Sequence, residues 1–194
     1  MTDRDAREAD LRACLDAGAH DRAAELAIRG WGPEIYGWLA GVLADPVDAG
    51  DAFALFAEQL WLSLRRYDGR CSTRTWCYML ARHAAGRVRD ARRRGAAVPL
   101  SQAPSVAAAV RTVTAAHQQT AVKDELRALR AALPEDDQML LVLRVDRDLG
   151  WREVAQIMAD EDATAIELDR HAAALRKRFE RIKAELRKRM PPRA

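Results

Sequence analysis

The segment Cys71–Gly95 constrains the fold most strongly, because its residues follow the order expected of one amphipathic helix. The apolar positions that recur at three- and four-residue spacing are Trp76, Leu80, His83 or Ala84, and Val88. Such spacing places them on one side of a helix, where they can pack into a core. We therefore predict a helix over most of this segment.

Arginines crowd the other faces and the end of this predicted helix. They are Arg74, Arg82, Arg87, Arg89, Arg92, Arg93 and Arg94. Between Arg87 and Arg94, five arginines stand against a single acid, Asp90. So many guanidinium groups suit a helix that lies against a polyanion. The alternative is a solvated face that keeps the chain soluble.

The composition of the 194 residues favours an all-α fold. Alanine, leucine and arginine are abundant, glycine is sparse, and alternating β-branched runs are missing. No apolar run approaches the roughly 20 residues that span a bilayer. The N-terminal residues are too acidic and too interrupted for a signal peptide. We expect a cytoplasmic protein.

Neither a metal centre nor a catalytic site is apparent in the sequence. Cys14, Cys71 and Cys77 lack partners at metal-ligand spacing, so we expect three reduced thiols. The histidines are scattered along the chain: His20, His83, His117 and His171. There is no phosphate-binding loop, paired carboxylate or Ser-His-Asp set. We therefore expect a protein without enzymatic activity and without a cofactor.

Charge is distributed very unevenly along the chain. Residues 1–60 hold twelve acids against five arginines, and residues 170–194 hold ten lysines or arginines against two acids. The net charge of +3 hides this asymmetry. An acidic end suits a basic protein surface, whereas a basic end suits phosphates and would bind DNA with a strong salt dependence.

Punctuating residues divide the chain into two helical domains. We predict an acidic N-terminal tail or helix over 1–21, a helical domain over 22–95, a linker over 96–119 and a second helical domain over 120–194. The linker is low in charge and rich in Ala, Ser, Thr, Gln and Pro. In the first domain, Asp45-Pro46 and Arg66-Tyr67-Asp68-Gly69 mark helix boundaries.

The second domain has the pattern of a helix-turn-helix. A short helix over Trp151–Met158 precedes a longer one with the apolar stripe Leu175, Phe179, Ile182 and Leu186. The basic residues predicted to bind DNA on the longer helix are Arg176, Lys177, Arg178 and Arg181. A solvated helix or a coiled-coil strand is the alternative for this segment.

In order and spacing, these motifs resemble the extracytoplasmic-function sigma factors, two-domain specificity subunits of bacterial RNA polymerase. Asp48-Ala-Gly-Asp-Ala52, with Phe53–Trp61, resembles the family's "D-A-E-D" helix. Arg74-Thr-Trp-Cys-Tyr-Met-Leu-Ala-Arg-His-Ala84 resembles its "W-L-x-x-I-A-R-N" helix. Leu133-Pro-Glu-Asp-Asp-Gln138, Trp151-Arg-Glu-Val-Ala155 and Leu175-Arg-Lys-Arg-Phe179 resemble "L-P-x-x-x-R", "S-x-x-E-I-A" and "V-K-S-R-L".

The resemblance implies a role for each group of residues. Asp48, Asp51, Phe56, Glu58 and Trp61 would dock on core RNA polymerase. The arginines of Cys71–Gly95, with His83, would bind promoter DNA at the −10 element, while an unstacked base is captured near the Arg65–Thr73 loop. The basic residues of the second domain would bind at the −35 element. An anti-sigma factor is a further partner that the family implies, although no residue here identifies one.

The sequence also departs from the family pattern. Gly50 replaces an acid of "D-A-E-D", and His83 replaces an asparagine. Ala155 and Leu175 are twenty residues apart, about twice the family's separation. The extra stretch, Asp160–Asp169, is acidic and either lengthens the turn or extends the recognition helix backwards. Besides a sigma factor, the sequence allows a DNA-binding regulator that acts without polymerase; an enzyme has little support.

Overall fold

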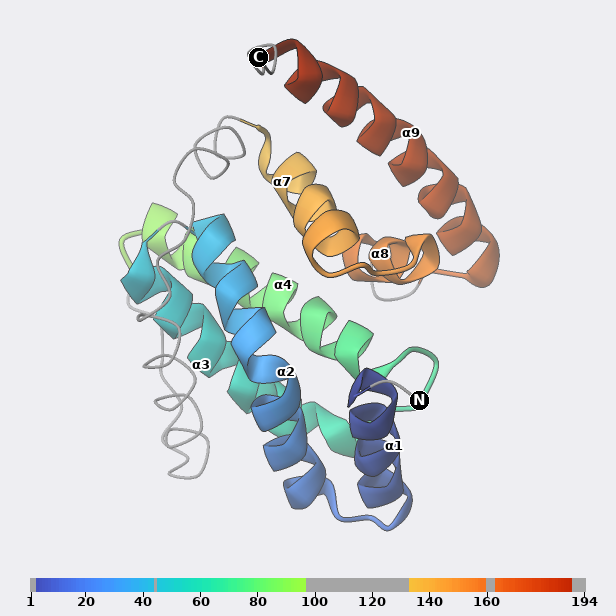
Figure 1. Cartoon of the computed structure of the whole chain (residues 1–194). Coiled ribbons are helices and arrows are strands. Elements are labelled where there is room, and N and C mark those ends of the chain that lie inside the picture. Colours follow the sequence, from blue (N-terminus) through green and yellow to red (C-terminus); the bar gives the residue numbers. More distant parts are fainter. Residues whose placement is uncertain (1–2, 44, 97–132, 160–162, 190–194) are drawn as a thin grey trace. The chain divides into compact units, whose positions relative to one another are not determined.

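The computed structural model describes residues 3–43, 45–96, 133–159 and 163–189 (Figure 1). All regular structure in these ranges is helical, which confirms the predicted all-α class. The chain divides into two compact units, Met1–Ala121 and Val122–Ala194. Within the described ranges, no helix has the length and apolar character needed to cross a membrane.

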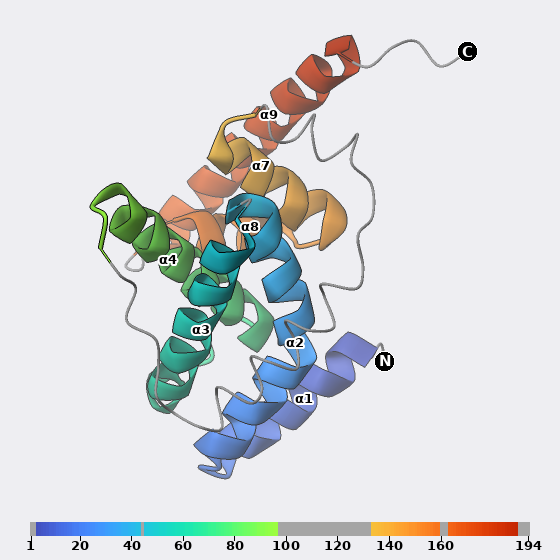
Figure 2. The same ribbon diagram turned by 90° about the vertical axis from the view of Figure 1, so that its left-hand side faces the viewer.

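The first unit is a helical bundle. It contains α1 (Asp3–Asp16), α2 (His20–Leu43), α3 (Pro46–Ser63), the 3-10 turn η1 (Leu64–Arg66) and α4 (Thr73–Arg93). Helices α2, α3 and α4 pack against one another, and α1 lies along α2 and touches α4 (Figures 1 and 2). The acidic N-terminal segment, whose structure the sequence left open, thus forms a helix of the bundle.

Aromatic side chains fill the centre of this bundle. Tyr36 meets Phe53 edge to face at 5.5 Å between ring centroids, and Trp38 meets Tyr78 at 5.9 Å. All four rings are almost completely buried. Such edge-to-face pairs stabilise a core beyond the area that they bury. They join α2 to α3 and to α4, and so fix the position of α4.

Local signals begin and end these helices. The Asp45 carboxylate accepts a hydrogen bond from the Val47 amide at 2.8 Å, and Pro46 occupies the first turn of α3. Helix α4 ends at Arg93, and the positive φ of 63° at Gly95 lets the Ala96 amide donate to the Ala91 carbonyl at 2.9 Å. The boundaries predicted at Asp45-Pro46 and at Arg66–Gly69 are confirmed, because α3 begins at Pro46 and the turn η1 ends at Arg66, before α4 begins.

The second unit contains α7 (Glu135–Leu141), the π-helical turn η2 (Val142–Asp146), α8 (Trp151–Met158) and α9 (Ala165–Arg189). Helix α9 packs against α8 and α7. Its buried positions include Leu168, Ala172, Leu175, Phe179 and Ile182. The predicted apolar stripe of the long helix therefore faces the unit's core. The predicted linker 96–119 lies outside the described residues except for Ala96.

Candidate nucleic-acid interface

Helix α4 buries a broad face and exposes its C-terminal arginines. The residues buried along it are Thr73, Arg74, Thr75, Cys77, Tyr78, Leu80, Ala81, Ala84, Ala85, Val88 and Ala91. Trp76, predicted to anchor the helix in the core, lies at the margin of this face and is only partly buried. Its ring packs against Tyr67 with centroids 5.7 Å apart. The core contact of α4 thus runs through Tyr78 and the small residues that follow.

Arg74 is not available to phosphate in this structure. Its side chain is only 4% exposed, and its Nε and Nη2 donate to the two oxygens of Glu34 at 2.6 and 3.0 Å. A fork-to-fork pair of this kind satisfies both groups inside the bundle. Its position on α4 faces α2 rather than solvent, so the contacts of Arg74 do not support the prediction that it binds DNA.

The other α4 cations divide into two groups by exposure. Arg82, His83 and Arg89 are half-buried. The exposed group comprises Arg87, Arg92, Arg93 and Arg94. Among the described residues, Arg87 and Arg94 have no ion pair, so their guanidinium groups are available to an anion. Arg93 pairs with Asp90 one turn earlier, which lowers the pKa of that carboxyl.

Arg92 connects the predicted DNA-binding helix to the predicted docking helix. Its Nε donates to the Asp48 carboxylate at 2.7 Å, and its Nη2 lies 3.5 Å from the Asp45 carboxylate. The hydrogen bond to Asp48 raises the pKa of Arg92. A residue predicted to bind DNA and one predicted to bind polymerase therefore neutralise each other in the free chain.

The outward side of α3 combines apolar and acidic residues. Val47 and Leu62 are 64% and 63% exposed, at the two ends of the helix. Between them lie three partly exposed residues, Asp51, Glu58 and Trp61. Asp51 follows Val47 by four residues, Glu58 follows Asp51 by seven, and Trp61 follows Glu58 by three, so all of them lie on one side of the helix. We call these five residues the α3 outer face. The sequence analysis missed Val47 and Leu62, which helical spacing from Asp51 and Glu58 would have added.

Burial affects two of the predicted docking residues, Phe56 and Asp51. Phe56 is fully buried and packs against Phe53 with 5.5 Å between ring centroids, so its burial does not support the predicted polymerase contact. Asp51 has a raised pKa, mainly because burial disfavours its charge and secondly because Asp48 lies nearby. A carboxylate whose ionisation is disfavoured in the free chain is a candidate contact for a cationic partner.

A pocket of about 310 Å³ opens beside the loop that precedes α4. Its lining residues are Arg12, Leu15, Asp16, His20, Leu64, Arg65, Tyr67, Asp68 and Gly69. The Tyr67 hydroxyl donates to the Cys71 carbonyl, and burial raises its pKa. Nδ1 of His20 is buried without a hydrogen-bond partner. The pocket thus offers an aromatic edge, apolar contacts and polar groups at the loop where the resemblance places base capture.

In the second unit, two of the predicted DNA-binding residues are held by neighbours. Nε of Arg178 donates to Asp137 of α7 at 2.5 Å, and its side chain is 33% exposed. Arg176 lies over the Trp151 ring, 5.6 Å from its centroid. Arg178 therefore joins α9 to α7, and the prediction that it positions DNA is not supported by its contacts.

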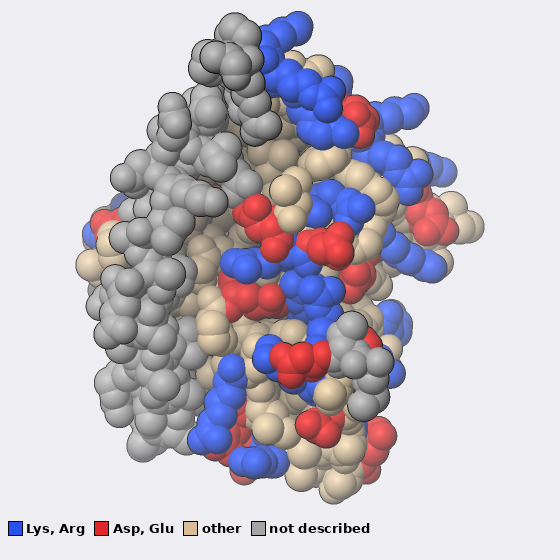
Figure 3. Space-filling view, in the orientation of Figure 1, with Lys and Arg blue, Asp and Glu red and all other residues tan. Residues whose placement is uncertain are grey.

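The exposed side of α9 forms a basic face. Arg170, Lys177, Arg181 and Lys188 are exposed at intervals of seven, four and seven residues, which places them on one side of the helix. Exposed alanines at 173, 174 and 184 leave room for close approach of the backbone. Figure 3 shows lysine and arginine side chains gathered along α9. The sequence analysis placed only Lys177 and Arg181 of this set in the interface.

The acidic stretch Asp160–Asp169 extends the long helix backwards over its second half. Helix α9 begins at Ala165, and the Thr164 amide and hydroxyl both donate to Glu167 at 2.8 and 2.7 Å. This capping box lowers the pKa of Glu167. Glu167 and Asp169 would repel phosphate at the start of α9, so we expect phosphate contact only from Arg170 onwards.

Among the described residues, no group of three histidine, cysteine or acidic side chains is placed to hold a metal ion. The candidate contacts of the first unit are the exposed arginines of α4 and the pocket, and those of the second unit are the basic face of α9. Compared with protein-family models, curated proteins and solved structures, this chain matches none.

Proposed function

We propose that the chain is a sigma factor of the extracytoplasmic-function type, which binds core RNA polymerase and directs it to promoters. The observation that carries the proposal is the basic face of α9. Four exposed cations at intervals of seven, four and seven residues, with exposed alanines on the same helix, suit the phosphates that border a DNA groove. This face belongs to a different compact unit from the arginine-rich α4, as two separate promoter elements would require.

The first unit would melt and hold the −10 region. Arg87 and Arg94 bind backbone phosphates, and the half-buried Arg82, His83 and Arg89 lie on the same helix. The pocket accepts a base that has left the stack. Unstacking a base requires a few kcal/mol, which contacts of the whole polymerase complex offset.

The α3 outer face would dock on polymerase. Its exposed Val47 and Leu62 supply apolar contact, and Asp51 supplies a negative charge that a basic partner surface would stabilise. The chain itself supplies no chemistry and needs no cofactor, and it acts in the cytoplasm. An anti-sigma factor would be a second partner, on the strength of the family resemblance alone.

The test is co-elution of the purified chain with core RNA polymerase, followed by run-off transcription from the DNA upstream of its own gene. We expect a stable complex and a discrete transcript that core enzyme alone does not make. Binding to DNA without binding to core enzyme would favour the second candidate, a regulator that acts without polymerase. Failure to bind either would refute both.

A further inference from the structure

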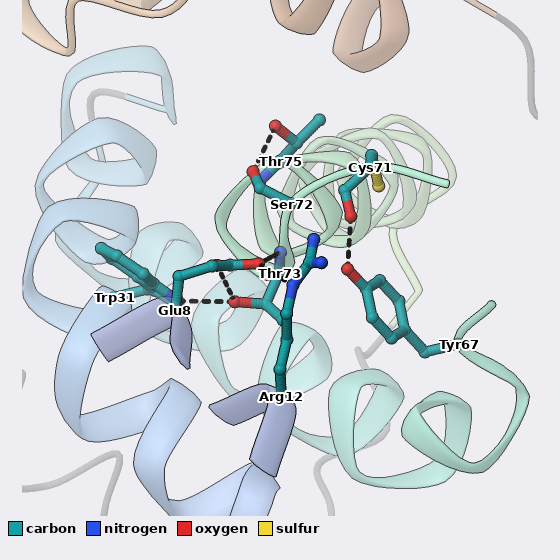
Figure 4. A network of polar contacts seen from close by, with 8 residues as sticks. All are labelled: Glu8, Arg12, Trp31, Tyr67, Cys71, Ser72, Thr73 and Thr75. Carbon is teal, nitrogen blue, oxygen red and sulfur yellow. Dashed lines mark hydrogen bonds and ion pairs between the residues drawn. The ribbon is translucent and has the colours of Figure 1, made fainter. Parts of the chain in front are cut away.

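Glu8 of α1 contacts the first residue of α4, 65 positions away in the sequence (Figure 4). Its Oε1 accepts a hydrogen bond from the Thr73 amide at 2.8 Å, and its Oε2 accepts one from the Thr73 hydroxyl at 2.6 Å. The Trp31 indole donates to the same hydroxyl oxygen at 3.2 Å. The Glu8 side chain is only 19% exposed. Three helices therefore meet at Thr73.

This contact closes the N-terminus of α4. The first amides of a helix have no partner within the helix, and a negative charge there is favoured by the helix dipole. Ser72 caps the Thr75 amide at 3.0 Å from within the loop. The Thr73 amide instead depends on Glu8, which belongs to another element. Helix α1 is thus part of the cap of α4.

The loop that leads into the capped end of α4, and the helix α1 that caps it, both line the pocket. The loop from Tyr67 to Ser72 runs from the pocket wall directly into the capped end of α4, and Tyr67 is tied to the Cys71 carbonyl. On the facing side, α1 contributes Arg12, Leu15 and Asp16 to the lining. Arg12 also contacts Glu8, with 3.3 Å between Nε and Oε1. Helix α1 therefore supplies one wall of the pocket and anchors the loop that supplies another.

We propose that Glu8 is a positioning residue for base capture: α1 holds the Tyr67–Ser72 loop in the conformation that admits an unpaired nucleobase. The ligand class rests on the proposed function, whereas the anchoring of the loop does not. Glu8 itself touches no DNA. Its removal would release the loop and lower affinity for unpaired DNA, but it would leave phosphate contacts of the α9 basic face intact.

The first experiment tests the anchor without DNA, by limited tryptic cleavage after Arg70, which lies exposed in the loop. Glu8→Ala should accelerate this cleavage about tenfold, since loss of a charge-assisted hydrogen bond shifts the opening equilibrium by that order. Glu8→Gln keeps an acceptor for the Thr73 amide and should restore most of the protection. The matched control is Asp10→Ala, which removes an exposed carboxylate from the same helix. Equal cleavage in Glu8→Ala and Asp10→Ala would overturn the anchor.

The second experiment measures binding of the complex with core polymerase to two DNA probes. One probe is forked, with an unpaired −10 strand, and the other is a fully paired duplex of equal length. We expect Glu8→Ala to weaken binding of the forked probe about tenfold, Glu8→Gln to recover it, and duplex binding to change little. Equal losses on both probes would show a purely structural role. If even the unaltered chain binds neither probe, the proposed function fails, while the cleavage result still decides the anchor.

Discussion

Whether an arginine of α4 contributes to stability or to binding depends on what its guanidinium meets. Arg74 and Arg87 lie on the same helix, yet Arg74 is enclosed with Glu34 and Arg87 is exposed. A buried charge needs its partner, because desolvation penalises it strongly when the partner is lost. An exposed one is stabilised by water and remains available for phosphate.

We therefore expect Arg74→Ala to lower the free energy of unfolding by about 3 kcal/mol, since it leaves Glu34 without its partner. Arg87→Ala should change it by no more than about 0.5 kcal/mol. Urea unfolding followed by circular dichroism measures both. The double variant Arg74→Met with Glu34→Leu should recover most of the loss. Similar values for the two single alanine variants would contradict a structural role for Arg74.

The three cysteines should react at very different rates. Cys14 and Cys71 are partly exposed, whereas Cys77 is fully buried, and burial raises the pKa of its thiol. Since the thiolate is the reactive form, both effects protect Cys77. We expect an aromatic disulfide reagent to label two thiols of the native chain and the third only in denaturant. Cys77→Ala should abolish the labelling that appears only in denaturant. If it instead removed one of the two thiols labelled in the native chain, the buried thiol would be another cysteine.

In helix α3, Asp51 suits a binding surface but weakens the fold. The raised pKa of Asp51 means that its ionised form is disfavoured in the folded chain. The resulting destabilisation develops as pH rises from the ordinary aspartate pKa through the raised one, and it disappears below both. An acid that weakens the fold at neutral pH is consistent with a functional site.

Asp51→Asn should therefore increase the free energy of unfolding at about pH 7, by less than about 1 kcal/mol because solvent screens the carboxylate. The increase should shrink at about pH 4, as the native carboxyl takes up its proton. The same variant should bind core polymerase more weakly. Asp10→Asn, an equal charge change on the exposed side of α1, is the control. A stabilisation that persists unchanged in acid would mean that charge is not its cause.

For the whole molecule, the two compact units should contribute separately to DNA binding. Each cation that neutralises a phosphate steepens the dependence of log K on log salt by about 0.9. Lys177→Ala with Arg181→Ala changes one unit, and Arg87→Ala with Arg94→Ala changes the other. Changes at sites without shared partners usually add.

Each pair of substitutions should reduce the salt slope by about 1.8, and the four together by about 3.6. Fluorescence anisotropy of promoter DNA with the polymerase complex, over a series of salt concentrations, measures the slope. Arg22→Ala with Arg29→Ala, two exposed residues of α2, provides the control and should leave the slope unchanged. If only one pair changes the slope, the other unit does not meet phosphate in the complex.

Composition was sufficient to predict the all-α class, and punctuating residues such as Asp45-Pro46 were sufficient to predict helix boundaries. The pairs that enclose Arg74 and Arg178 could not be predicted, since their partners lie 40 and 41 residues away on other helices. Burial could not be predicted either: Phe56, expected at a docking surface, is fully buried, and Trp76, expected in the core, is only partly buried. A spacing pattern identifies a face of a helix, but only the neighbouring helices decide whether that face is enclosed.

The sequence by itself determined that this chain is helical, that its charges separate along its length, and that its arginine-rich segment forms one helix. Local propensity and spacing suffice for these properties, because neighbouring residues decide them. Only the tertiary structure decided which arginines remain exposed, that Arg92 meets Asp48, and that Glu8 caps α4. Those contacts join residues far apart in the chain, and their existence depends on how whole helices pack.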